Sequence, residues 1–247
     1  MLTAPDEKLT RFQAAGIEEV LFLEFNQAFA ELTPDEFVLR ILKDGIGVRD
    51  LFVGEHFAFG KGRAGRTADL IRLGARWGFQ VHPVAAMRVD GEVVSSSRIR
   101  TLVQAGDVGG AARCLGRLYA LTGPVVQGER RGQALGWPTA NLRLPRGRVI
   151  PADGVYATTV VWNARHFDSV TYLGTRPTFG PGERLLEVYL LDEHVSLYGE
   201  DIRVQFVERL RGDLTFARPE ELAAHIHQDV DRARETLKAV AQSLTDA

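Results

Sequence analysis

A short run of side-chain oxygens in the second half of the chain has the composition of a metal site. It lies in the tetrapeptide Pro138-Thr139-Ala140-Asn141. The proline disfavours helical backbone at Trp137, so we expect an extended segment, in which residues two apart share a face. The Thr139 hydroxyl and the Asn141 amide oxygen then lie side by side. Neutral oxygens suit Mg²⁺, which takes further ligands from water and substrate phosphates. The competing interpretation is an edge strand with two solvated polar residues.

Glycines punctuate the residues that precede this segment. Glycine lets backbone N–H groups approach phosphate oxygens closely, and a concave run of such groups binds anions. The spacing therefore favours a phosphate-binding loop, although hairpin turns use the same residue type. The glycines are Gly123, Gly128, Gly132 and Gly136, with Arg130 and Arg131 between them.

A lone carboxylate, Glu187, interrupts the apolar run from Leu185 to Leu191. In a strand it would share one face with leucine and tyrosine side chains, and the opposite face would be wholly apolar. Burying a carboxylate without a partner is costly, so we expect either a functional site or an ion pair with Arg176 or Arg184. With the glycine loop and the two oxygen ligands, Glu187 completes a set suited to phosphoryl transfer. That set has a phosphate cradle, a metal site and a base for a hydroxyl.

The two halves of the chain differ in the spacing of their apolar residues. Over residues 1–117, helical patterns alternate with short apolar runs, which is typical of a parallel sheet covered by helices. We expect helices at Asp6–Ala15, Thr33–Gly45 and Thr67–Trp77, and strands at Val20–Phe25, Asp50–Val53 and Phe79–Val84.

Over residues 118–247, short runs rich in valine, tyrosine, threonine and leucine follow one another between glycine and proline turns. This pattern predicts a small antiparallel barrel. A long amphipathic helix from about Pro219 to Val240 is expected to close the chain. The expected strands are Tyr119–Val126, Gly154–Trp162, Asp168–Leu173, Leu185–Leu191 and Ile202–Val207.

The motifs of the second half, in their order, closely resemble the riboflavin kinase module. The resemblance extends from about Tyr119 to Leu237. It implies a six-stranded flavin-kinase barrel that transfers the γ-phosphoryl group of ATP to the 5′-hydroxyl of riboflavin. The motifs are Gly123–Gly128, Leu135–Asn141, Pro151–Tyr156, Gly174–Phe179, Leu185–Val188, Leu210-Arg211, Phe216 and Asp229.

The resemblance also implies a role for each site residue. Thr139 and Asn141 would hold Mg²⁺, and Glu187 would be the catalytic base. Arg211 and Asp213 fall where the family contacts the flavin, although the family usually has glutamate at the second position. The residues implied in ATP binding are Gly128, Gly132, Gly136, Pro138 and Thr139.

The first half resembles part of the FMN adenylyltransferase to which bacterial riboflavin kinases are commonly fused. Val53–Gly60 resembles its middle segment, and Val94–Arg100 resembles its Ser-Ser-Thr-x-Ile-Arg signature. The resemblance implies an incomplete Rossmann-like nucleotidyltransferase module with a vestigial ATP site. That site would comprise Ser96, Ser97 and Arg100. Read without the family, Ser95 and Ser96 are also suitable N-caps for a helix.

The family's His-x-Gly-His motif does not occur among the six histidines of this sequence. We therefore expect these 247 residues to make FMN, and to have lost most or all of the activity that converts FMN and ATP into FAD and pyrophosphate. An upstream extension of the native protein is the alternative explanation. An incomplete sheet would leave an unpaired edge and bare apolar surface, which favours self-association.

Composition excludes several classes of protein. Lys and Arg total 30 against 32 Asp and Glu, so no basic excess predicts binding to nucleic acid. No apolar run is long enough to cross a membrane. The single cysteine, Cys114, excludes an internal disulfide and fits a reducing cytoplasm.

Two motifs and one non-enzymatic function were also weighed. Gly60–Thr67 resembles the P-loop consensus, but Arg66 occupies the position of the consensus lysine. His225 and His227 are two apart on a predicted helix and point to different faces, which disfavours a metal site. A non-catalytic flavin-binding or regulatory protein remains the alternative to the kinase, although pure binding would not require a metal pair and a base.

Overall fold

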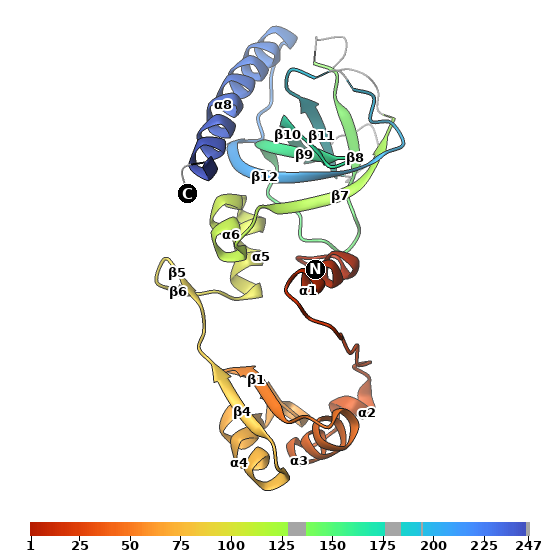
Figure 1. The fold of residues 1–247 in the computed structure, drawn as a ribbon. Coiled ribbons are helices and arrows are strands. Elements are labelled where there is room, and N and C mark those ends of the chain that lie inside the picture. Colours follow the sequence, from red (N-terminus) through yellow and green to blue (C-terminus); the bar gives the residue numbers. More distant parts are fainter. Residues whose placement is uncertain (128–136, 176–183, 194, 246–247) are drawn as a thin grey trace. The chain divides into compact units, whose positions relative to one another are not determined.

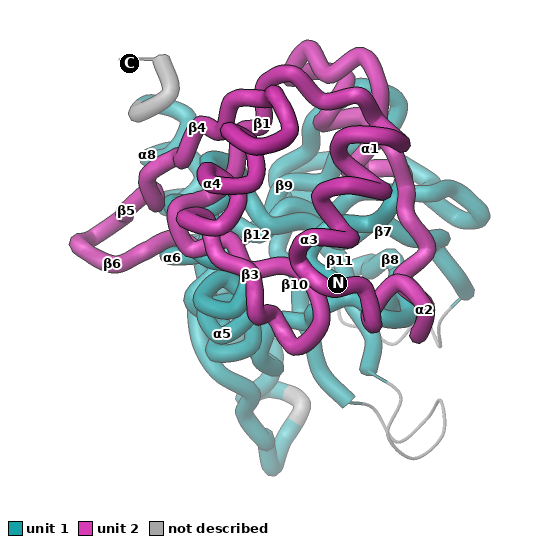
Figure 2. Tube along the Cα trace, turned by 90° about the horizontal axis from the view of Figure 1, so that it is seen from below, with its two compact units in different colours: residues 1–5, 95–247 teal, residues 6–94 magenta. Residues whose placement is uncertain are grey.

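The computed structural model describes residues 1–127, 137–175, 184–193 and 195–245. The chain divides into two compact units, coloured separately in Figure 2. One comprises residues 6–94, and the other comprises residues 1–5 together with 95–247. Among the described residues, no helix is long and apolar enough to span a lipid bilayer.

The unit formed by residues 6–94 contains a two-stranded parallel sheet, β1 with β4, in which Leu51 lies opposite Val81. Its core joins this sheet to the helices η1 and α4 through Val38, Leu70 and Leu73, all fully buried. The elements are α1 (Pro5–Ala14), α2 (Gln27–Ala30), α3 (Pro34–Glu36), η1 (Phe37–Ile46), β1 (Asp50–Gly54), β2 (Ala58–Phe59), η2 (Lys61–Arg63), β3 (Gly65–Arg66), α4 (Thr67–Trp77), β4 (Gln80–Val84), β5 (Arg88–Val89) and β6 (Glu92–Val93).

The helix predicted from Thr33 is present, and its start follows from a capping box. The Thr33 hydroxyl accepts a hydrogen bond from the Glu36 backbone, and the Glu36 carboxylate accepts one from the Thr33 backbone. From Phe37 onward the backbone winds as a π-helix until Gly47, whose φ of 70° terminates it. A glycine at that left-handed position is the usual helix C-terminus.

The strand predicted at Val20–Phe25 is wrong. These residues form no strand, and Phe22 and Phe25 are 64% and 77% exposed. An apolar run becomes a strand only where a neighbour pairs with its backbone and a second layer covers its side chains. The sheet of this unit is also bare on one face, where Phe52 is 69% exposed and stacks on His82 at 4.5 Å between ring centroids.

The second unit is built around a closed barrel of six antiparallel strands in the order β10-β11-β8-β7-β12-β9 (Figure 1). Alternation places Leu142, Leu186 and Phe206, all fully buried, inside the barrel. The elements of the unit are α5 (Ser96–Ala105), α6 (Val108–Leu115), β7 (Tyr119–Val126), β8 (Ala140–Arg143), β9 (Gly154–Trp162), β10 (Arg165–Thr175), β11 (Arg184–Leu190), β12 (Asp201–Gly212) and α8 (Pro219–Thr245).

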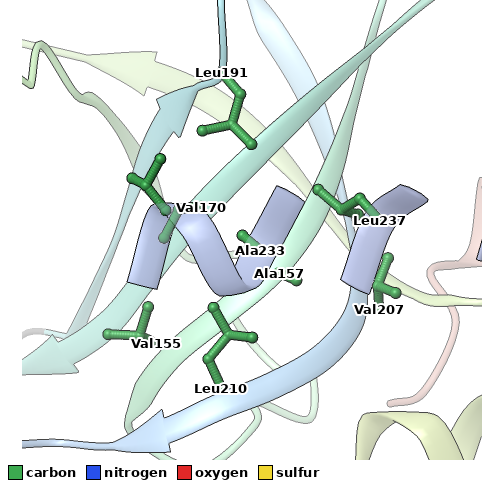
Figure 3. Packing of buried hydrophobic residues seen from close by; sticks show 9 residues of the cluster. Val155, Ala157, Val170, Leu191, Val207, Leu210, Ala233 and Leu237 are labelled. Atoms are coloured by element: carbon green, nitrogen blue, oxygen red, sulfur yellow. The ribbon is translucent and has the colours of Figure 1, made fainter. Parts of the chain in front are cut away.

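Helix α8 covers part of the outer surface of the barrel. The packing cluster under it is shown in Figure 3. Its helical members lie on one face of α8, as expected of an amphipathic helix, which explains why this helix stays on the barrel. They are Val230, Ala233 and Leu237, and the barrel contributes Val155, Ala157, Val170, Leu191, Val207 and Leu210.

Two helices and the first residues of the chain also belong to the barrel unit. Cys114 is buried in α6, as expected for an inert thiol. The Val149 N–H donates to the Met1 carbonyl at 3.0 Å, and Arg148 Nη2 donates to the Leu2 carbonyl at 2.8 Å. The compact units thus divide between residues 94 and 95, and the module boundary at 117/118 stays a prediction.

Candidate active site

The register of three strands gathers the predicted metal ligands and the predicted base on one face. Asn141 on β8 lies directly opposite Glu187 on β11, and Tyr172 on β10 lies opposite Glu187 on its other side. Side chains directly opposite each other in a sheet have Cβ atoms about 4.5–5.5 Å apart. Thr139 stands two residues before Asn141, at the entry to the same strand. Since Leu186 and Val188 point into the barrel, this face is its outer surface.

This face forms one wall of a cavity of about 690 Å³. A volume of this size is typical of sites that bind small molecules or cofactors. The barrel, the segment before β8, the loop after β12 and helix α8 all contribute to its lining. The lining residues are Trp137, Thr139, Val155, Val170, Tyr172, Glu187, Tyr189, Arg211, Asp213, Leu214, Thr215, Phe216, Leu222, Ile226, Asp229 and Val230.

A second, smaller cavity of about 100 Å³ adjoins the same segment. Pro138, Thr139 and Ala140 line it together with residues of β11 and of the segment before β12. Thr139 lines both cavities. The predicted metal ligand therefore belongs to the walls of both spaces.

Glu187 is half-buried in the wall of the large cavity. Arg184, one of the two arginines considered as its partner, alternates to the opposite face and donates from Nε to Asp153 Oδ1 at 2.8 Å. It also donates from Nη2 to the Pro151 carbonyl at 2.7 Å. Arg176 lies outside the described residues, and so do all three predicted ATP-binding glycines, Gly128, Gly132 and Gly136.

Arg211 is held at the cavity by a buried carboxylate on α8. Its Nε donates to both Asp229 oxygens, at 3.0 and 3.1 Å, and its Nη2 donates to Oδ2 at 2.8 Å. The guanidinium also lies 5.8 Å from the centre of the Phe216 ring. A register shift between Arg209 and Arg211 turns the end of β12, so both Leu210 and Arg211 face the helix.

Asp213 lies in the loop after β12, at the rim of the cavity. The Tyr172 hydroxyl donates to its Oδ1 at 3.2 Å, and the Leu214 N–H donates to the same atom at 3.0 Å. The shorter side chain found here in place of the family's usual glutamate therefore still reaches the barrel wall. Through Tyr172 it is linked to the strand position opposite Glu187.

The predicted adenylyltransferase residues lie on α5. Ser95 is its N-cap and accepts a hydrogen bond from the Arg98 N–H at 3.2 Å. Ser96 and Ser97 occupy the first turn of the helix, and both are exposed, as is Arg100. A capping role for Ser95 is confirmed, and a vestigial ATP site at the other three residues stays a prediction.

Sequence reasoning overlooked part of the cavity. Tyr172 and Tyr189 lie in apolar runs that predict only strands, yet both line the cavity. Asp229 had been noted as a motif residue without a partner. The sequence does carry a sign of its role: Asp229 is an acidic residue next to Val230 on the apolar stripe of a helix. Glu187 shows the same pattern, a carboxylate within an apolar run.

The class of protein follows from the barrel, its covering helix and comparisons with known families. Residues 115–237 match the family described as riboflavin kinase, and residues 1–98 match the family described as FAD synthetase. The solved structure of a protein described as a macrolide-efflux protein from Streptococcus pneumoniae superposes with a TM-score of 0.87 at 29% identity. The alignment covers 94% of this chain and 75% of that one.

Two curated relatives identify the particular family. The bifunctional riboflavin kinase/FMN adenylyltransferase of Pseudomonas fluorescens is 40% identical, over 94% of this chain and 76% of its own length. The enzyme of the same name from Escherichia coli K12 is 36% identical, over 95% and 75%. The chain belongs to this family of bifunctional riboflavin kinase/FMN adenylyltransferases, and its barrel unit is the riboflavin kinase.

Proposed function

We propose that riboflavin occupies the large cavity and receives the γ-phosphoryl group of ATP on its ribityl 5′-hydroxyl, with Glu187 as the base. The observation that carries this assignment is the direct cross-strand pairing of Glu187, which lines the large cavity, with Asn141 on the neighbouring strand. The pairing brings a carboxylate next to the predicted metal ligands. Arg211 and Asp213 line the same cavity and supply the contacts on the flavin side.

The reaction needs one proton acceptor and an in-line approach. The riboflavin hydroxyl oxygen forms a bond to the γ-phosphorus while the bond from phosphorus to the β-bridging oxygen breaks and ADP leaves. The hydroxyl proton passes to the Glu187 carboxylate, which stands opposite Asn141 and Tyr172 on the outer barrel face.

The nucleotide is assigned to the smaller cavity. Thr139 lines both spaces, so phosphates that leave the smaller cavity past this residue point toward Glu187. The small cavity is bounded by Val125, Val188 and Leu197. Apolar walls of this kind suit a purine ring, and the large cavity then remains free for the acceptor.

Mg²⁺ is the metal that fits the Thr139/Asn141 pair. Asn141 is only 7% exposed, and a buried amide needs polar partners. Among the described residues there is no group of three His, Cys, Asp or Glu side chains arranged for a metal. One hydroxyl and one amide oxygen suit a cation that draws its other ligands from phosphates and water. When bound, Mg²⁺ would neutralise charge that develops on the transferring phosphates.

Replacing Glu187 with glutamine tests the role of the base. Glutamine keeps the size of the side chain but cannot accept the proton, so FMN formation from riboflavin and MgATP should fall about 10²- to 10⁴-fold. The matched control is Glu208→Gln, because Glu208 is an exposed carboxylate on the same barrel. Unchanged turnover in E187Q would refute the assignment. No FMN formation by the wild-type chain would favour a flavin-binding protein without catalysis.

FAD formation is a separate test. The 247 residues contain no His-x-Gly-His motif, so incubation with FMN and MgATP should yield no appreciable FAD. The same preparation should convert riboflavin to FMN. Appreciable FAD would show that the adenylyltransferase activity does not depend on that motif.

Self-association is assigned to the bare sheet face of residues 6–94. Parallel sheets are normally covered on both faces, yet Phe52 and Val84 are 69% and 51% exposed. We propose that a second copy of the chain packs against this exposed sheet face. Light scattering after gel filtration should detect a concentration-dependent dimer that Phe52→Ser abolishes. Ile71→Ser, at a 48% exposed position on α4, should not affect it. A monomer at all concentrations would refute the assignment.

The cytoplasm is the compartment that suits this activity. The sequence has one cysteine, which is buried in α6. A chain without a structural disulfide has no need of an oxidising compartment. Fractionation of cells that express the chain should recover it with cytoplasmic markers.

A further inference from the structure

Two histidines on α8 contact aromatic rings in different walls of the large cavity. The His227 ring meets the Trp137 ring edge-on, with 4.7 Å between centroids and 77° between planes. The His225 ring lies 5.0 Å from the Phe216 ring, at 45°. Both aromatic rings line the cavity, and Ile226 between the histidines lines it too.

The helical spacing explains how neighbouring histidines reach different walls. An α-helix advances about 100° per residue, so side chains two apart point about 200° away from each other. Ile226 lies between them and faces the cavity floor. The same spacing that disfavours a metal site thus allows one helical turn to contact both the segment before β8 and the loop after β12.

We propose that His225 and His227 are positioning residues that fix the two aromatic walls of the flavin site. His227 holds Trp137 and His225 holds Phe216, so α8 sets the separation of the rings between which the flat flavin ring binds. The proposal rests on the assignment of riboflavin to the large cavity. Neither histidine needs to touch the substrate.

The two walls are supported unequally. Phe216 has a second neighbour, the Arg211 guanidinium, which is itself fixed by Asp229. Trp137 has no second ring contact among the described residues. It also stands two residues before Thr139, with only Pro138 between them. Because proline fixes its own backbone angle, a displaced Trp137 should carry Thr139 with it.

This inequality predicts different kinetic effects for the two histidines. His227→Ala should raise KM for riboflavin and lower kcat, each about 3- to 10-fold, because both a flavin wall and a metal ligand are displaced. His225→Ala should raise KM for riboflavin about 2- to 3-fold and leave kcat unchanged. His227→Phe keeps an aromatic ring against Trp137 and should restore both constants.

Steady-state kinetics of the full chain with riboflavin and MgATP measures these constants. Quenching of riboflavin fluorescence on binding reports ring stacking independently of turnover. Gln228→Ala is the matched control, because Gln228 is an exposed neighbour on the same helix. It should match the wild type.

The outcomes separate this proposal from the one on which it rests. Wild-type kinetics in His227→Ala, or an equal defect in His227→Phe, would refute the positioning role while leaving riboflavin in the cavity. A wild-type chain that neither binds nor phosphorylates riboflavin would refute the proposed function itself. Loss of riboflavin quenching in His227→Ala, with recovery in His227→Phe, would support the proposal that the ring at position 227 positions Trp137.

Discussion

Replacing Asp229 with alanine should destabilise the barrel unit and weaken flavin binding together. Asp229 is 4% exposed and receives three hydrogen bonds from Arg211. In the alanine variant the Arg211 guanidinium loses its counter-charge, although the Arg211 side chain is only 17% exposed. Since Arg211 also supports the Phe216 ring, the loop after β12 loses its anchor.

The magnitude follows from burial. Removing one partner of a fully buried ion pair costs about 3–5 kcal/mol, because the other charge is left uncompensated. Arg211 keeps a little solvent contact through the cavity, so we expect the low end, about 3 kcal/mol. The pair Arg218–Glu221 at the start of the same helix has side chains that are 72% and 40% exposed. Glu221→Ala should therefore cost less than about 0.5 kcal/mol, as surface pairs do.

Hydrogen exchange of the β9 and β10 amides, followed by mass spectrometry, measures the free energy of opening of the barrel. The double replacement Arg211→Met with Asp229→Leu removes both charges and should recover much of the lost stability, but not the riboflavin affinity. If Asp229→Ala changes the opening free energy no more than Glu221→Ala does, the pair does not anchor α8. The physical reasoning would then be wrong.

Three further changes test other contacts. Gly154→Ala should lower the thermal midpoint sharply, because the residue has a φ of 149° and a Cβ would lie 2.3 Å from the Arg211 carbonyl oxygen. Gly174→Ala should raise KM for riboflavin, because its Cβ would lie 2.1 Å from the Tyr172 hydroxyl and must displace a ring that lines the cavity. Burial raises the pKa of Tyr156 to about 12. The unfolded tyrosine ionises first, so its stabilising contribution is complete below pH 10 and is lost between pH 10 and 12. In alkaline urea titrations the wild type should lose stability between pH 10 and 12, whereas Tyr156→Phe, which also lacks the hydrogen bond to the Ala152 carbonyl, should show no such loss in that interval. A pH-dependent loss of the same size in both proteins would contradict the assignment.

Local patterning was sufficient for most of the barrel. The strand bounds Tyr119–Val126 and Gly154–Trp162 agree with the structure because turn residues delimit both runs. The face of Glu187 also followed from alternation alone. Its pairing with Asn141 did not, because register between strands that are distant in sequence depends on the closed barrel.

Other features required tertiary information. The run Val20–Phe25 has the composition of a strand, but composition does not supply the neighbouring strand that would pair with it. Similarly, the sequence of α8 predicts an amphipathic helix. Its periodicity does not predict the contact of Asp229 with Arg211 or that of His227 with Trp137. The cavity between the barrel and this helix was therefore absent from the sequence-based prediction.

The proposed location of the chemistry on the outer wall of a closed barrel has a consequence for engineering. Along β11, Leu186 and Val188 fill the interior, while Glu187 and Tyr189 line the large cavity. Because successive positions serve different layers, the acceptor specificity of the kinase can be redesigned at the outward positions without repacking the interior. The outward positions that line the cavity can therefore be changed one strand at a time, whereas outward positions buried under α8, such as Ala157 and Val207, must be kept.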